Sequence, residues 1–219
     1  VGSEMCIRDS VNGIKDILGI WIGESEGKHY WMQIFDEIKA RGVEDILFIS
    51  MDGVSGLEEG AKSIFKDVVV QRCIVHLIRN SIKYIPSKDY KAYTAQLKKV
   101  YGASSLKAAE AEFECFKQAW SQYPGAIDVW IRNWSNIEQL FNYGSAVRKV
   151  MYTTNAIESL NSTYRKLNRQ RSVFPSDTAL LKALYLATFE ATKKWTTTIR
   201  DWGQVYGELS IMYEGRLPE

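Results

Sequence analysis

The stretch Asp45-Ile46-Leu47-Phe48-Ile49-Ser50-Met51-Asp52-Gly53 decides the fold class of this 219-residue chain. Its apolar part, residues 46–51, has the length and composition of a buried strand, and the Asp-Gly pair that follows is typical of a turn. Asp52 is therefore expected at the carboxyl end of a strand. In open α/β sheets, this is the edge at which ligands and reacting groups are usually found.

Strands and helices alternate on both sides of this stretch. Asn12-Gly13 is a hairpin signal, but the hairpin's first strand is expected to be missing. Alternation of this kind implies a parallel sheet covered by helices, with right-handed crossovers. The expected elements are a strand over 14–22, an amphipathic helix over 29–41, a strand over 46–51, a short helix over 57–65, a strand over 68–71 and a helix over 74–84.

The pattern changes after residue 87. Residues 88–150 contain no convincing strand, and their apolar spacing indicates helices, with a break at Tyr123-Pro124-Gly125. Two further helices are expected over 155–169 and 175–194, followed by an irregular or weakly helical tail. We therefore expect a core over 11–87, a helical insertion over 88–150 and a return to the core over 151–219.

The first ten residues, Val-Gly-Ser-Glu-Met-Cys-Ile-Arg-Asp-Ser, fit no expected element and no secretory signal. They resemble a translated sequencing adaptor. We therefore expect residues 1–10 to be foreign and the natural protein to extend further upstream.

Composition is that of an ordinary globular chain, with 46% hydrophobic and 25% charged residues. The net charge of +2 is too small to indicate nucleic-acid binding by itself. No apolar run reaches the length of a membrane span. The three cysteines, Cys6, Cys73 and Cys115, are odd in number and far apart, which favours a reducing compartment over a disulfide framework. A cytoplasmic location is expected.

Three motifs, in this order, carry a resemblance to a known family. They are Asp52-Gly53, then Val70-Gln71-Arg72-Cys73-Ile74-Val75-His76-Leu77-Ile78-Arg79-Asn80-Ser81, then Tyr152-Thr153-Thr154-Asn155-Ala156-Ile157-Glu158-Ser159-Leu160-Asn161. Together they resemble the bacterial Mutator-type transposases of the IS256 group. The resemblance runs from about Gly13 to the C-terminal region.

The resemblance implies an α/β fold of the RNase H-like type, a mixed sheet with helices, interrupted by an all-helical insertion domain. It also implies three acidic residues that cut and join DNA with Mg²⁺, or alternatively Mn²⁺. Asp52 matches the second acidic residue and Glu158 the third. The first has no counterpart, so we expect this fragment to be inactive. The partners it implies are the element ends, the target DNA and a second copy of the chain.

The chemistry of such a site is independent of the resemblance. Carboxylates suit magnesium, and two metal ions can stabilise the attacking and leaving oxygens of phosphodiester cleavage. Each residue also has a local alternative. Asp52 could simply form the Asp-Gly turn, and Glu158 could complete a capping box with Asn155 at the start of its helix.

The helix that begins near Asn155 is expected to have a polar face that contains Glu158 and Asn161, opposite an apolar side that contains Leu160 and Tyr164. This face could bind phosphate, with Arg165 near the cleavage point, or it could be an ordinary solvated basic helix. The candidate DNA-binding residues are Asn161, Arg165, Lys166, Arg169 and Arg171, with Arg148 and Lys149 adding positive charge just before the helix.

Cys73 and His76 form a Cys-x-x-His pair at the start of a helix. A structural zinc would need further ligands, and no other Cys or His lies at ligand spacing. The pair matches a family signature, which suggests a structural role or one that supports the active site together with Asn155, although His76 could instead be a satisfied core histidine. The aromatic residues of the insertion are expected in its core, with one of them open to stacking on a DNA base: Trp120, Trp130, Trp134, Phe141 and Tyr143.

Three functions remain open at this level. The first is a transposase catalytic domain that cleaves and joins DNA at the terminal inverted repeats of an insertion sequence. The second is an RNase H-like nuclease or resolvase that only hydrolyses DNA. The third is a catalytically incomplete DNA-binding fragment. The motifs favour the transposase.

Overall fold

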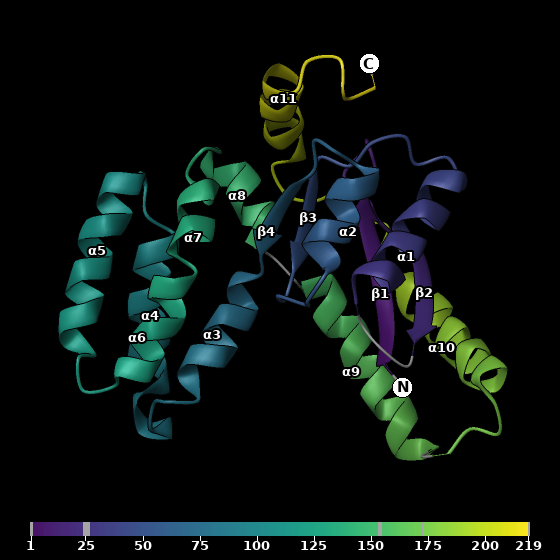
Figure 1. The fold of residues 1–219 in the computed structure, drawn as a ribbon, viewed down its shortest axis with the longest axis horizontal. Coiled ribbons are helices and arrows are strands. Elements are labelled where there is room, and N and C mark those ends of the chain that lie inside the picture. Colours follow the sequence, from purple (N-terminus) through teal and green to yellow (C-terminus); the bar gives the residue numbers. More distant parts are fainter. Residues whose placement is uncertain (1, 24–26, 153–154, 172, 219) are drawn as a thin grey trace. The chain divides into compact units, whose positions relative to one another are not determined.

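The computed structural model describes residues 2–23, 27–152, 155–171 and 173–218. Over these residues the chain is mixed α/β and mostly helical (Figure 1). It divides into two compact units that alternate along the sequence. The first unit comprises Val1–Ile46, Val54–Asp67 and Thr153–Glu219, and the second comprises Leu47–Gly53 and Val68–Tyr152. The domain boundaries expected at residues 10, 87 and 150 stay predictions.

A β-hairpin begins the first unit. Strand β1 (Gly2–Asp9) pairs antiparallel with β2 (Lys15–Gly23), and the register shifts between Cys6 and Ile7. The expectations that the first ten residues fit no element and that the hairpin lacks its first strand are therefore wrong. A strand without a neighbour leaves a row of backbone N–H and C=O groups without hydrogen-bond partners. The turn at Asn12-Gly13 brings β1 alongside β2, and β1 provides those partners. Whether this segment is foreign stays a prediction.

Helix α1 (Lys28–Ala40) matches its sequence pattern closely. The four apolar side chains at helical spacing, Trp31, Ile34, Phe35 and Ile38, are all buried. Helix α2 (Leu57–Ile64) packs against α1 in the same unit, and Phe35 meets Phe65 edge to face with ring centroids 6.4 Å apart. The predicted amphipathic helix is confirmed.

Three C-terminal helices complete the first unit: α9 (Asn155–Gln170), α10 (Asp177–Thr192) and α11 (Trp202–Met212). The tail is more ordered than its sequence suggests, because tertiary contacts anchor it. The indole Nε1 of Trp202 donates to the carbonyl of Val11 at 2.7 Å. Arg216 forms two hydrogen bonds with the carboxylate of Asp45, at 2.7 and 2.9 Å.

The second unit contains a two-stranded parallel sheet. Strand β3 (Phe48–Met51) pairs with β4 (Val69–Arg72), with Phe48 opposite Val69 and Met51 opposite Arg72. The two strands are close to those expected. Among the described residues, however, the strands form two separate two-stranded sheets and not one mixed sheet.

Helices make up the rest of the second unit, as expected for residues 88–150. Their core includes Trp130, whose buried indole Nε1 donates to Ser81 Oγ at 3.0 Å. Gln71 of β4 donates to the carbonyl of Asn136 at 2.8 Å, which ties the sheet to these helices. The helices are α3 (Ile74–Ile82), the 3-10 turn η1 (Ser87–Asp89), α4 (Tyr90–Tyr101), α5 (Leu106–Ala119), α6 (Pro124–Arg132), α7 (Trp134–Leu140) and α8 (Ser145–Tyr152).

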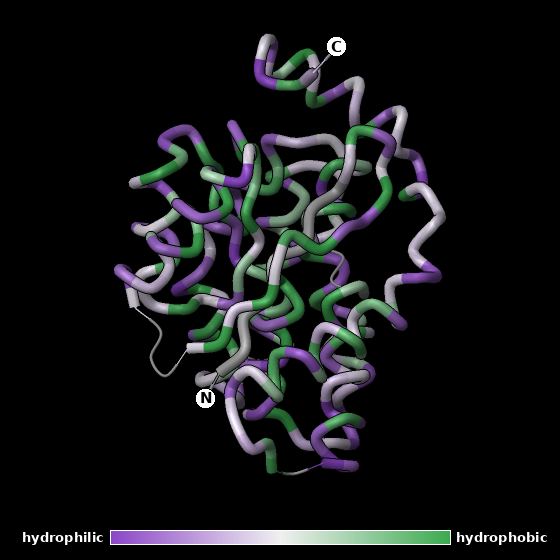
Figure 2. Tube along the Cα trace, turned by 90° about the vertical axis from the view of Figure 1, so that its right-hand side faces the viewer, coloured by the Kyte–Doolittle hydropathy of each residue, from purple (hydrophilic) through white to green (hydrophobic). Residues whose placement is uncertain are grey.

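Hydrophobic and hydrophilic stretches alternate along the helical turns of the chain trace, as the green and purple colours in Figure 2 show. Such mixing indicates helices with one buried side and one exposed side. Within the described ranges, no helix is both long enough and apolar enough to cross a bilayer.

Candidate active site

Asp52 lies at the carboxyl end of β3, as its sequence context predicts. Its side chain is 47% exposed. Gly53 follows with φ of +97°, a conformation that L-residues rarely adopt. A β-carbon at Gly53 would lie 2.0 Å from Nη1 of Arg72, so the Arg72 guanidinium packs directly on this turn. The Asp-Gly turn thus places a partly exposed carboxylate next to a residue that contacts the Arg72 guanidinium.

Cys73 and His76 reach the same edge of the sheet from β4. The amide of Cys73 donates to the carbonyl of Met51 at 2.7 Å, which extends the ladder to the residue before Asp52. Cys73 is the N-cap of α3, so His76 follows within the first turn. As a result, Nε2 of His76 lies 4.0 Å from Oδ2 of Asp52.

The two side chains of this Cys-x-x-His pair differ in character. Burial raises the pKa of the Cys73 thiol, against the opposing effect of the backbone N–H groups of His76 and Val75. A protonated thiol is a poor metal ligand, because metals bind the thiolate. His76 is only half-buried, and its Nδ1 is buried without a hydrogen-bond partner in the described part of the chain. It is therefore not a satisfied core histidine.

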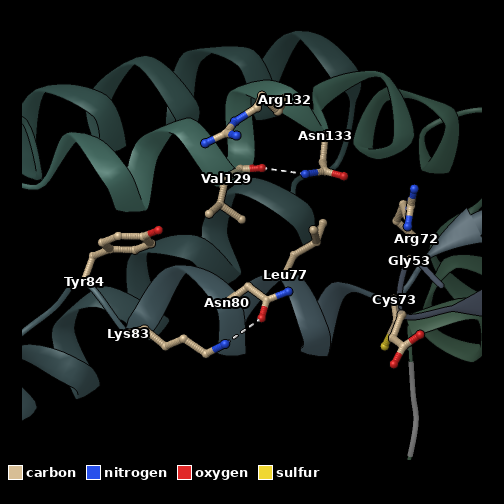
Figure 3. Close-up of a pocket in the computed structure, with 11 residues that line it drawn as sticks. Gly53, Arg72, Cys73, Leu77, Asn80, Lys83, Tyr84, Val129, Arg132 and Asn133 are labelled. Carbon is tan, nitrogen blue, oxygen red and sulfur yellow. Dashed lines mark hydrogen bonds between the residues drawn. The ribbon is translucent and has the colours of Figure 1, made fainter. Parts of the chain in front are cut away.

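A cavity of about 440 Å³ opens beside Asp52, entirely within the second unit. Side chains from α3 and α6 line its two sides (Figure 3). Three of its lining residues are cationic and one is a carboxylate, so positive charge predominates. The lining residues are Asp52, Gly53, Arg72, Cys73, Leu77, Asn80, Lys83, Tyr84, Val129, Arg132 and Asn133.

Glu158 belongs to the other unit, in the first turn of α9. Helix α9 is amphipathic as predicted: Leu160 and Tyr164 are buried, and Tyr164 shares a hydrogen bond with Thr188 of α10. The capping box with Asn155 falls on a side chain outside those described. The candidate DNA-binding side chains of α9 and the residues after it are all exposed: Asn161, Arg165, Lys166, Arg169 and Arg171.

A second cavity, of about 340 Å³, touches the first turn of α9. Ala156 and Ser159, on either side of Glu158 in sequence, line it together with Lys15 and Lys194. All its lining residues belong to the first unit. Two lysines near this turn give it a chemistry that suits an anion.

Arg148 is not available to DNA, contrary to its place in the predicted basic cluster. It is 5% exposed, its Nη1 donates to the carbonyl of Ala103 at 2.9 Å, and its guanidinium lies 4.6 Å from the centroid of the Phe141 ring. The apolar spacing of α8 turns this side inward together with Val147 and Met151. Lys149 is exposed.

Three of the five aromatic residues expected in the core of the insertion are buried, and Trp134 and Phe141 are half-buried. Trp120, Trp130 and Tyr143 are buried. Trp134 stacks on Phe113 at a centroid distance of 4.3 Å. The exposed aromatic residue at the cavity is instead Tyr84, which the sequence analysis did not single out.

Among the described residues, no three His, Cys, Asp or Glu side chains come together as a metal-binding group. Asp52 nevertheless suits magnesium, because Mg²⁺ commonly uses one or two protein carboxylates and takes further oxygens from water and phosphate. Its exposed carboxylate beside a basic cavity fits that pattern.

Comparison with known proteins decides the family. A family model described as "Transposase, Mutator family" matches residues 6–198. The chain belongs to the Mutator family of transposases. It is 37% identical over 207 residues to a probable transposase for an ISRM3-like insertion sequence element of Sinorhizobium fredii, covering 94% of this chain and 52% of that protein.

Other relatives of this Mutator-family chain are also named as transposases of insertion sequence elements. It is 38% identical over 184 residues to a probable insertion sequence transposase of Corynebacterium diphtheriae, covering 83% of this chain and 54% of that protein. It is 23% identical over 194 residues to the transposase for IS256 in transposon Tn4001 of Staphylococcus aureus, covering 87% of this chain and 50% of that protein. The chain thus spans about half the length of the curated relatives it matches.

Sequence reasoning missed most of the cavity next to Asp52 in this Mutator-family chain. Arg72 and Asn80 lie within a motif that was recognised, so their position beside Cys73 and His76 was a usable signal. Arg132 ends α6 and Asn133 follows it, about fifty residues further along the chain. No local pattern marks them, because only the packing of α6 against α3 brings them to the site.

Proposed function

We propose that this chain carries part of the catalytic centre of a DNA transposase of the DDE type, built on an RNase H-like fold. The observation that carries the proposal is Asp52, exposed at the carboxyl end of a parallel strand and bordering a cavity rich in cations. Membership of the Mutator family supports DNA as the substrate. Under this proposal the chain acts on element ends and target DNA.

Asp52 and Glu158 would hold Mg²⁺, or alternatively Mn²⁺. When bound, such ions polarise the phosphoryl oxygens and lower the pKa of the attacking water or hydroxyl. Nε2 of His76 lies 4.0 Å from Oδ2 of Asp52, so the imidazole would restrict the rotation of that carboxylate. We assign His76 and Cys73 to this supporting role.

The protein's cations would position the DNA backbone. Arg72 adjoins the Asp52 turn, and Lys15 and Lys194 border the first turn of α9. The exposed basic residues of α9 would contact phosphates without reading bases. Replacing Arg165 with Ala is therefore expected to remove one phosphate contact. For duplex DNA, the slope of the logarithm of the binding constant against the logarithm of salt concentration should then become shallower by about 0.9. An unchanged slope would count against this role.

A strand-transfer assay with labelled element ends tests the reaction. It should use this chain and an extended protein of its relatives' length that contains it, each with Mg²⁺. In the extended protein, Asp52→Asn and Glu158→Gln are each expected to slow joining by about 100-fold or more, since a metal ligand contributes several kcal/mol to the transition state. Glu110→Gln, an exposed carboxylate on α5, is the matched control.

The products separate the remaining alternatives. Joined DNA supports the transposase. Hydrolysed ends without joining would indicate a nuclease or resolvase, and full activity of Asp52→Asn would remove Asp52 from the reaction. We also propose that the active species is a homodimer or a higher assembly in the cytoplasm, because two element ends must be held together; sedimentation with and without element-end DNA tests the assembly.

A further inference from the structure

The cavity beside Asp52 has the chemistry of a single-stranded nucleic-acid site. We propose that it binds a short unpaired DNA segment next to Asp52, with one base stacked on the ring of Tyr84. The proposal rests on the proposed function, because it takes DNA as the substrate, and it adds a binding site for one DNA strand. Proteins that hold single strands combine a basic groove with aromatic side chains on which bases stack.

Tyr84 provides the stacking surface. It lies just beyond the end of α3 and is 54% exposed. One side of its ring lies against Gly125, where an added β-carbon would be 2.7 Å from Cε1. Glycine is thus what allows the ring to lie close to the start of α6. A ring held in this way loses little freedom when a base stacks on it.

The cations provide the phosphate contacts. Lys83 Nζ donates to Oδ1 of Asn80 at 3.1 Å, and Arg132 Nε donates to the carbonyl of Asp128 at 3.3 Å. These described partners are neutral oxygen atoms, so they orient the two cations without neutralising them. Arg72 adds a third positive charge at the Asp52 turn.

The layout favours a strand over a duplex or a free anion. Figure 3 shows Tyr84 at one end of the cavity and Arg72 with Gly53 at the other. The nine residues of α3 between them span roughly 13 Å at about 1.5 Å per residue. A cavity of about 440 Å³ is small for a duplex. The bases of a duplex are also stacked on one another, so they cannot stack on Tyr84 unless they are unpaired.

The amides fit the same occupant. Asn80 lines the cavity, and so does Asn133, the C-cap residue of α6, which donates through Nδ2 to the carbonyl of Val129 at 2.7 Å. Their remaining amide oxygen and N–H groups can accept from or donate to base edges and sugar oxygens. A cavity for a simple inorganic anion would need neither these amides nor an exposed ring.

Fluorescence anisotropy with the 219-residue chain tests the proposal. The probes are a labelled oligo-dT of about 12 nucleotides, within the roughly 4–16-nucleotide range of single-strand sites, the same strand made entirely of abasic units, and a blunt duplex. Tyr84→Ala is expected to weaken oligo-dT binding about tenfold, in line with base-stacking losses of about 1–3 kcal/mol. Tyr84→Phe should bind as wild type does.

The abasic strand isolates the stacking contact. Wild-type protein should bind it about tenfold more weakly than oligo-dT, whereas Tyr84→Ala should bind the two strands equally. Arg132→Ala should reduce the salt slope of oligo-dT binding by about 0.7. Tyr90→Ala and Lys107→Ala, an exposed tyrosine and an exposed lysine in the same unit but outside the cavity, are the controls and should change neither quantity.

Several results would overturn the proposal. One is that Tyr84→Ala loses affinity for the duplex and for oligo-dT to the same extent. Another is that Tyr84→Ala binds oligo-dT as tightly as wild type does. A third is that a mononucleotide binds to the wild-type protein as tightly as oligo-dT does. Asp52→Asn separates this question from the reaction. In the extended protein it should slow strand transfer about 100-fold or more, whereas in the 219-residue chain the loss of a negative charge beside the cavity should not weaken oligo-dT binding. If strand transfer survives Asp52→Asn, the proposed function fails, whatever the binding data show.

Discussion

Replacement of Gly53 by alanine tests the turn that presents Asp52. The backbone of Gly53 has φ of +97°, and a β-carbon there would meet Arg72 Nη1 at 2.0 Å and Cζ at 3.2 Å. The contact is with the far end of a flexible side chain, so the guanidinium can move aside. The strained backbone cannot, and such conformations cost about 1–3 kcal/mol in residues other than glycine.

Alanine also makes the unfolded chain less flexible, which offsets about 0.4–1 kcal/mol of that cost. The expected net loss for Gly53→Ala is therefore about 1–2 kcal/mol in the free energy of unfolding. Urea titration followed by circular dichroism measures it. Gly203→Ala in α11, where a β-carbon meets nothing within 4 Å, should change stability in the opposite direction, by about +0.8–1 kcal/mol.

A double-mutant cycle then separates backbone strain from the clash with Arg72. If strain dominates, Gly53→Ala should cost the same in the Arg72→Ala background, within about 0.5 kcal/mol. Hydrogen exchange at the Cys73 amide, which donates to Met51, reports whether the loss is local to the sheet end. A Gly53→Ala protein as stable as wild type would refute the argument that this turn requires positive φ.

Three further outcomes follow from individual contacts. Ser81→Ala should cost about 1–3 kcal/mol in urea titration, because it leaves the buried Trp130 indole N–H without its acceptor; a loss below ~0.5 kcal/mol would mean that another acceptor takes over. Hydrogen bonding and charge from Arg216 lower the pKa of Asp45 below its usual 3.8, although partial burial opposes this. The lowered pKa means that the ionised Asp45 stabilises the folded protein. The stabilisation is complete above the pKa of Asp45 in the unfolded chain and is lost as the pH falls through its lower pKa in the folded protein. Because the Asp45 side chain is 36% exposed, the stabilisation should be under about 1 kcal/mol. Arg216→Ala should remove this contribution from the pH dependence of stability measured by acid unfolding. Identical acid-unfolding curves for the variant and the wild type would contradict the pairing. Ser105→Ala should cost about 0.5–2 kcal/mol in the thermal stability of the second unit, since Ser105 Oγ caps the first turn of α5, and Ser105→Asp, which keeps a cap, should not.

Local periodicity predicted most of the helices and strands. The four buried residues of α1 and the inward face of α9 follow from helical spacing alone. The position of Asp52 at a strand end also follows from the apolar run before it and the Asp-Gly turn after it. These features depend on residues within one or two turns of each other, which is the range that a sequence pattern can report.

The hairpin and the C-terminal tail depend on contacts between residues that are further apart in the sequence. Strand β1 has little pattern of its own and pairs because β2 offers it unsatisfied backbone groups. Helix α11 has apolar residues on several sides, so its sequence marks no buried face, and its contacts with Val11 and those of Arg216 with Asp45 order the tail. Long-range contacts of this kind leave no local signature.

The sequence by itself determined the family, most of the helices and strands, and the acidic residue at the end of β3, because recurrent motifs and hydrophobic period are properties of adjacent residues. Only the tertiary structure decided what surrounds that residue. It placed Arg132 and Asn133 opposite α3, brought Tyr84 to the cavity, set His76 4.0 Å from Asp52 and buried Arg148 away from solvent. The physical reason is packing: which faces of α3, α6 and α8 meet depends on how whole helices fit together, and that fit joins side chains that are far apart along the chain.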